Sequence, residues 1–96
     1  MTTLLIHHRV ADYEAWKEVY DSVEDMQRDG GVRSHRVWRS ADDPNMVVVE
    51  HEFDSREAAK QFMDRSDLQE TMARGGVDRS SMQAELLDEA SRAARA

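Results

Sequence analysis

The four histidines are the side chains of this chain best suited to chemistry near neutral pH, where a neutral imidazole is both a base and a metal ligand. They are His7, His8, His35 and His51, and all fall in segments that read as strands. No HxH, HxxxH or HExxH spacing occurs, and the adjacent His7 and His8 point to opposite faces of a strand, so no metal site is predicted. Two interpretations remain for the histidines: proton transfer in a pocket, or half-buried strand residues bonded to backbone or carboxylate groups.

His35 and His51 are expected to be direct neighbours across a β-hairpin spanning residues 32–53. Its turn, Asp42-Asp43-Pro44-Asn45, contains the only proline, which fixes φ, and an Asn that tolerates left-handed geometry. The preferred register pairs opposite charges and aliphatic side chains, as in Arg36–Glu50 and Val37–Val49. A shift by one residue would set Val37 against Glu50. On the preferred register both histidines share a face with Phe53.

Trp16 and Tyr20 lie one turn apart on the apolar stripe of an amphipathic helix predicted over residues 12–29. Asp12 is the expected N-cap, and Gly30-Gly31 the expected stop. The two aromatic side chains are either walls of a ligand cavity between helix and sheet or ordinary core residues.

The rest of the chain predicts two more helices and a strand. Asp54 or Ser55 caps a helix that buries Phe62. Ser66 with Gln69 forms a capping-box pattern that restarts a helix ending at Gly75-Gly76. A weak strand follows over residues 77–87. The order β-α-β-β-α-α-β indicates an α+β domain over residues 1–96, with a four-stranded antiparallel sheet, helices on one face, and a loosely ordered tail at 88–96.

A sheet with helices on one face leaves the other face bare, and both faces of the hairpin carry apolar side chains. We therefore expect a homodimer through the bare face, because a chain of 96 residues must cover that face with a partner. The residues assigned to this interface are Arg36, Trp38, Val48 and Glu50.

Composition excludes several classes of partner and site. The formal net charge is −7 and the pI is near 5.0, which disfavours nucleic acid and anionic membrane surfaces. There is no Cys for a disulfide or a thiolate. No leader or membrane-spanning pattern is visible, so a cytoplasmic protein is the expectation. Nucleophile-elbow, phosphate-loop and dinucleotide-binding motifs are also missing, and the two Gly-Gly pairs read as helix stops.

Three stretches carry a family resemblance: VADYEAWKEVYDS, GVRSHRVWRSADDPNMVVVEHEFDS and AAKQFMDRSDLQETMARGGV. Over residues 3–87 the chain resembles antibiotic biosynthesis monooxygenase-like proteins of the dimeric α/β barrel superfamily. The resemblance implies a ferredoxin-like fold, two sheets packed face to face, and a small hydrophobic or aromatic molecule held between sheet and helices. Characterised relatives oxidise aromatic polyketides without metal or flavin, degrade haem, or isomerise and cyclise small molecules, so the fold does not fix the reaction.

The chain departs from the pattern of those oxygenases. Phe53 stands near the usual Trp that leads into the second helix, and no His follows His51. Haem degraders have an Asn on the first strand, where this chain has Leu5-Ile6-His7. Both haem and quinol-type oxygenation are therefore put in doubt.

Two hypotheses follow. The first is a cofactor-free enzyme of secondary metabolism, a monooxygenase or a cyclase/isomerase, in which His35 or His51 accepts a proton. The second is a noncatalytic dimeric binding protein. A cavity of about 300 Å³ with convergent polar groups favours the enzyme, and a filled core favours the binding protein. The residues assigned to ligand contact are His7, Trp16, Tyr20, Phe53 and Phe62.

Overall fold

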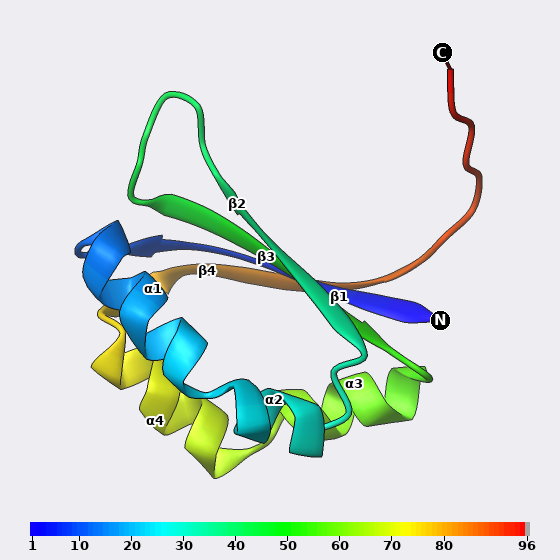
Figure 1. Ribbon diagram of the computed structural model, residues 1–96, viewed down its shortest axis with the longest axis horizontal. Helices are drawn as coiled ribbons and strands as arrows, with labels where there is room; N and C mark the ends of the chain where they lie inside the picture. Colours follow the sequence, from blue (N-terminus) through cyan, green and yellow to red (C-terminus); the bar gives the residue numbers. More distant parts are fainter. Residues whose placement is uncertain (96) are drawn as a thin grey trace.

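The computed structural model describes residues 1–95 as one antiparallel sheet with all of the helices on one side (Figure 1). The elements are β1 (Thr2–Val10), α1 (Tyr13–Ser22), α2 (Glu24–Asp29), β2 (Ser34–Arg39), β3 (Met46–Phe53), α3 (Arg56–Met63), α4 (Ser66–Arg74) and β4 (Val77–Asp88). The predicted α+β class and four-stranded sheet are confirmed. None of the helices in this range is long and apolar enough to cross a membrane.

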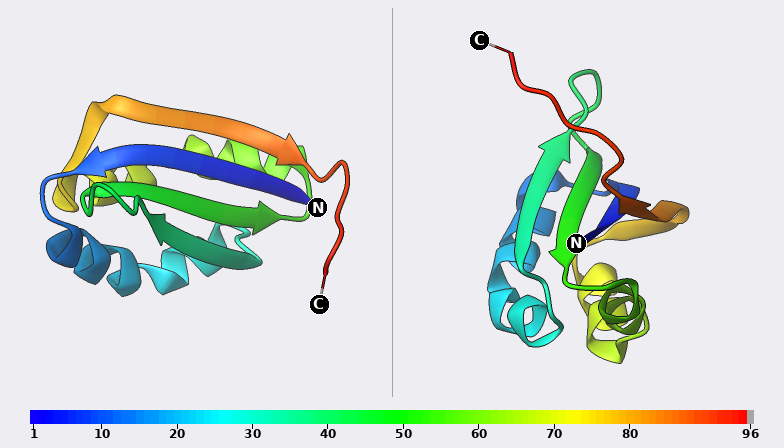
Figure 2. Two further views of the ribbon diagram at one scale, coloured as in Figure 1. Left: turned by 90° about the horizontal axis from the view of Figure 1, so that it is seen from above. Right: turned by 90° about the vertical axis from the view of Figure 1, so that its right-hand side faces the viewer.

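The strands lie in the order β2-β3-β1-β4, which is the order of a ferredoxin-like fold (Figure 2). In both central strands, burial alternates from residue to residue, as period-two geometry requires. The buried set of β1 includes Leu4, Ile6 and His8, which face the helices. His7 and its odd-numbered neighbours therefore face the bare side.

The hairpin register is the predicted one. His35 lies opposite His51, Arg36 opposite Glu50, and Trp38 opposite Val48. The turn differs from the expectation, because no non-glycine residue within 1–95 has a positive φ. Asn45 instead uses its side chain, whose Oδ1 accepts the backbone N–H of Tyr13 at 3.0 Å. This bond ties the hairpin loop to the start of α1.

The single helix predicted over residues 12–29 is wrong, because the chain breaks at Val23 into α1 and α2. Ser22 Oγ donates to the carbonyl of Val19 at 2.6 Å, and the Val23 N–H turns to Tyr20, three residues back. Both bonds compete with the regular helical pattern. Asp12 is the N-cap as predicted, accepting the Ala15 N–H at 3.0 Å.

Of the two caps predicted for the later helices, one is confirmed and one is wrong. Ser55 caps α3 by accepting the Ala58 N–H at 3.1 Å. The capping box at Ser66 is wrong, because Ser66 is already helical and Gln69 Nε2 donates to the Met63 carbonyl at 3.3 Å. Beyond β4, residues 89–95 adopt neither helix nor strand.

The core has two parts, one beneath α1 and one beneath α3 and α4. Leu4, Phe53 and Phe62 belong to the part beneath α3 and α4. Trp16 and Val47 belong to the part beneath α1. Both parts also contain side chains from the buried positions of β1 and β3, so the two central strands join the two halves.

The face of the sheet away from the helices is uncovered in this chain, as Figure 2 shows from above. Trp38 on this face is 49% exposed and Leu87 is 39% exposed. The Trp38 Nε1–H donates to Glu50 Oε1 at 3.1 Å, and the Arg36 guanidinium lies 5.4 Å from the Trp38 ring centre.

Candidate functional site

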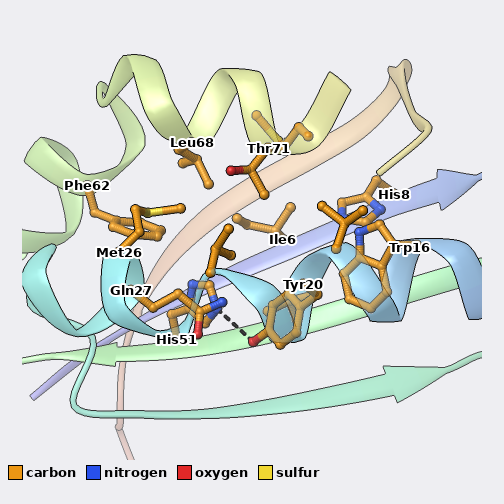
Figure 3. A pocket seen from close by; sticks show the side chains of 14 residues that line it. Ile6, His8, Trp16, Tyr20, Met26, Gln27, His51, Phe62, Leu68 and Thr71 are labelled. Atoms are coloured by element: carbon orange, nitrogen blue, oxygen red, sulfur yellow. Dashed lines mark hydrogen bonds between the residues drawn. The ribbon is translucent and has the colours of Figure 1, made fainter. Parts of the chain in front are cut away.

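A cavity of about 40 Å³ lies between the sheet and the helices, where the two parts of the core meet (Figure 3). Most of its lining is aliphatic or aromatic, and Ile6 and Val49 form its floor on the sheet. The polar side chains of the lining come from two strands and three helices, and they are His8, Tyr20, Gln27, His51 and Thr71. Such a mixture of apolar wall and a few polar groups is typical of small-molecule sites.

Tyr20 connects the two histidines of the hairpin. Its hydroxyl oxygen lies 3.0 Å from Nε2 of His51 and 2.9 Å from Nδ1 of His35. The hydroxyl has one proton to donate, so in one of these bonds it donates and in the other it accepts from a ring N–H. The two imidazoles must therefore hold the same tautomer, with the proton either on Nε2 of both rings or on Nδ1 of both rings.

Burial keeps both inner groups neutral at pH 7. Burial, with a smaller contribution from the neighbouring His35, lowers the pKa of His51 to about 4. Burial also raises the pKa of the Tyr20 hydroxyl far above its ordinary value. His51 Nε2 is engaged by Tyr20, whereas its Nδ1 is buried and has no hydrogen-bond partner in the described chain.

Trp16 and His8 form the second cluster of the cavity. Trp16 stacks on Tyr20 with ring centres 4.9 Å apart and meets the edge of His8 at 5.7 Å. Burial lowers the pKa of His8, and its Nδ1 also lacks a protein partner. The stack holds the Tyr20 ring in the orientation that places its hydroxyl between the histidines.

The predicted ligand contacts are only partly brought together. Trp16, Tyr20 and Phe62 line the cavity. Phe53 packs behind Phe62 at 5.4 Å and stays outside the lining. His7, the fifth predicted ligand contact, lies on the bare face, where it pairs with Val48, because neighbouring strand residues alternate between faces.

His8, Gln27 and Thr71 line the cavity but are not among the predicted ligand contacts. A signal existed for His8, since it shares the period-two face of Leu4 and Ile6. Gln27 is only 4% exposed and follows Tyr20 by seven residues, which is the spacing of one helical face, but a polar residue on an apolar stripe was not read as interior. Nothing in the sequence marks Thr71.

The four residues predicted to form a dimer interface do lie together on the bare face, where Trp38 bonds Glu50, contacts Arg36 and lies opposite Val48. Their role in association stays a prediction. Within residues 1–95, no group of three or more His, Asp or Glu side chains is placed to hold a metal ion.

Comparisons with known proteins agree with this arrangement. The profile of the family described as antibiotic biosynthesis monooxygenase matches residues 8–74. No functionally curated protein matches the chain. Many solved structures do, and three of them illustrate the likeness.

SnoaB, a cofactor-independent oxygenase from Streptomyces nogalater, has in one variant structure a TM-score of 0.76 and 13% identity, over 95% of this chain and 94% of that one. A Bordetella bronchiseptica protein assigned to the same family has a TM-score of 0.77 and 10% identity, over 93% and 96%. Rv0793 from Mycobacterium tuberculosis has a TM-score of 0.67 and 19% identity, over 98% and 100%.

At these identities, the structures show the shared fold alone. The match of the family profile covers well over half of the chain. The chain therefore belongs to the antibiotic biosynthesis monooxygenase family.

Proposed function

We propose that this protein is a cofactor-independent oxygenase that removes a proton from a small hydrophobic aromatic molecule bound between sheet and helices. The observation that carries the proposal is His51, a neutral imidazole in an apolar cavity with Nε2 bonded to Tyr20 and Nδ1 unpaired. Membership of the family and the likeness to SnoaB, described as a cofactor-independent oxygenase, support the choice of reaction.

Proton removal is the step that the cavity can perform. It leaves an electron-rich carbanion or phenolate, which can react directly with dioxygen. For a methylene between aromatic rings, CH₂ and O₂ become C=O and H₂O, with the electrons supplied by the substrate. A cyclase or isomerase begins with the same proton removal but consumes no oxygen.

The substrate must widen the cavity. A single aromatic ring needs roughly 150 Å³, whereas the cavity measures about 40 Å³. An open groove between the α1–α2 junction and α4 shares Val23, Met26 and Thr71 with the cavity. These side chains separate the two spaces, so we infer that the ligand enters there.

The noncatalytic alternative is a small-ligand-binding protein. It is favoured by the cavity volume of about 40 Å³, which is far below the roughly 300 Å³ of an ordinary small-molecule pocket. Polar groups nevertheless converge on this small space, as the enzyme hypothesis expects.

Anthrone and small phenols, offered in metal-free buffer while oxygen uptake is followed, test the proposal. We expect turnover by the wild-type protein and a loss of about 10²–10⁴-fold in His51→Ala, the usual contribution of a positioned base. Glu18→Gln, on the exposed side of α1, is the matched control. Binding without oxygen uptake would favour the noncatalytic alternative.

We also propose that the active form is a homodimer joined through the bare sheet face. An exposed Trp38, hydrogen-bonded and stacked with its neighbours, is a preorganised aromatic anchor. Such residues are enriched in interfaces relative to other surfaces.

A further inference from the structure

We propose that Tyr20 and His35 carry protons between His51 inside the cavity and water outside it. The inference rests on the proposed function for the source of the proton, but the structure of the path does not depend on the substrate. Tyr20 and His35 would then be positioning and relay residues, whereas His51 is the base that takes the proton from the substrate.

The three side chains His51, Tyr20 and His35 reach from the cavity to the surface. His51 is 3% exposed and lines the cavity. His35 is exposed and lines a surface hollow of about 170 Å³ on the other side of Tyr20. Tyr20 lines both spaces, and its hydroxyl is within hydrogen-bond distance of both imidazoles. One hydroxyl thus joins a buried base to a solvated one.

The burial of His51 explains why a route for protons to solvent is needed. A charged imidazole in an apolar cavity lacks solvation, so a proton taken up by His51 must leave quickly for the base to act again. At His35 the same charge is hydrated, and the carboxylates of Asp21 and Glu24 line the hollow.

The other charged groups around His35 come from each neighbouring element. A wider hollow next to the first includes Arg28 of α2, Arg33 before β2 and Asp54 after β3. Arg33 and Asp54 form an ion pair at 3.6 Å, which offsets one cation with one anion. On the side of α1 and α2, Asp21 pairs with Lys17 at 2.6 Å and Glu24 pairs with Arg28 at 3.8 Å, so cations offset these two carboxylates as well.

The transfer balances without an oxidant. The substrate proton bonds to Nδ1 of His51 while the Nε2 proton of His51 passes to the Tyr20 oxygen. The Tyr20 hydroxyl proton passes to Nδ1 of His35, which then releases its Nε2 proton to water. When the substrate anion has taken up O₂, the resulting peroxide needs one proton, and transfer in the reverse direction supplies it and restores the starting tautomers.

If Tyr20 had only a structural role, its removal would speed proton exchange at His51, whereas removal of a relay would slow it. Removing a hydrogen bond that only fixes two histidines loosens the site and lets solvent reach His51 more easily. Removing a relay instead leaves His51 without its route for protons. The rate at which His51 gains and loses a proton therefore separates the two roles.

That rate can be measured in the ligand-free protein by ¹⁵N relaxation dispersion on labelled histidine. With a pKa of about 4, roughly 1% of His51 is protonated at pH 6, which suffices for the measurement. We expect Tyr20→Phe and His35→Asn to slow the exchange by an order of magnitude or more, and Glu18→Gln to leave it unchanged. Added imidazole should restore the rate in His35→Asn, whose lost group was exposed, but not in Tyr20→Phe.

Unchanged or faster exchange in the two variants would overturn the relay. His35→Asn keeps the test valid if Tyr20→Phe does not fold, because His35 is at the surface. The exchange rate does not depend on turnover. Slowed exchange in the variants with no oxygen uptake by the wild-type protein would support the relay and reject the oxygenase. Unchanged exchange in the variants with oxygen uptake by the wild-type protein would reject the relay alone.

Discussion

Tyr20 is the residue on which the site depends most, because its ring packs on Trp16 and its hydroxyl bonds both His35 and His51. Tyr20→Phe keeps the ring but leaves a buried imidazole nitrogen unpaired. Unsatisfied buried groups cost about 1–3 kcal/mol. We therefore expect the free energy of unfolding in urea to fall by that amount. Unaltered stability would mean that the hydroxyl bonds contribute nothing to the folded state.

His51 makes stability depend on pH. Its pKa is about 4 in the folded protein against 6.5 ordinarily, so below pH 6.5 the unfolded chain binds a proton that the folded chain does not. The free energy of unfolding should therefore fall as the pH drops from 6.5 toward 4, by roughly 3 kcal/mol in total. Urea unfolding at several pH values measures this slope. His51→Gln should flatten it, and the same slope in both proteins would refute the assignment.

At the scale of helices and strands, the sequence predicts those features that follow from the periodic pattern of side chains. Cross-strand chemistry at Arg36–Glu50 and Val37–Val49 is specific enough to select the register, and the register brings His35 and His51 together. The break at Val23 could not be predicted in this way, because it depends on a local bond from Ser22 to a backbone carbonyl. Gln27 lies seven residues after Tyr20 and lines the cavity, but its place there was not predicted because a polar side chain is expected at the surface.

His7 and His8 show how a correct local rule can still give a wrong site. Alternation predicts that they face opposite sides, as they do. Which side faces the helices is decided by the buried set Leu4 and Ile6, and that set selects His8. Thr71 joins the site only through the packing of α4 against the sheet, which no local pattern encodes.

The C-terminal end of α2 is packed against the cavity wall. A Cβ added at Gly30 would lie 2.5 Å from Cδ1 of Phe62 and 3.2 Å from the carbonyl of Met26. Gly30→Ala should therefore destabilise the protein by about 1–3 kcal/mol, the usual cost of overpacking. Thermal unfolding of Gly30→Ala beside the exposed control Glu18→Ala tests this. Equal stability of the two variants would mean that the end of α2 does not pack against Phe62 as described.

The whole molecule presents one face that its own helices leave uncovered, with Trp38 near its edge. Apolar burial stabilises by roughly 25 cal/mol per Å², so covering this face in a dimer supplies several kcal/mol. Trp38→Asp should weaken association by placing a charge in the interface while leaving helix content unchanged. Light scattering and circular dichroism measure the two effects, and a wild-type monomer at micromolar concentration would contradict the dimer.

The most direct test of the oxygenase assignment is the fate of ¹⁸O₂ in metal-free buffer with anthrone as substrate. The account predicts a product that carries one labelled oxygen, with the other recovered in water, and a rate that falls by about 10²–10⁴-fold in His51→Ala. A product without label, or undiminished turnover in His51→Ala, would contradict it.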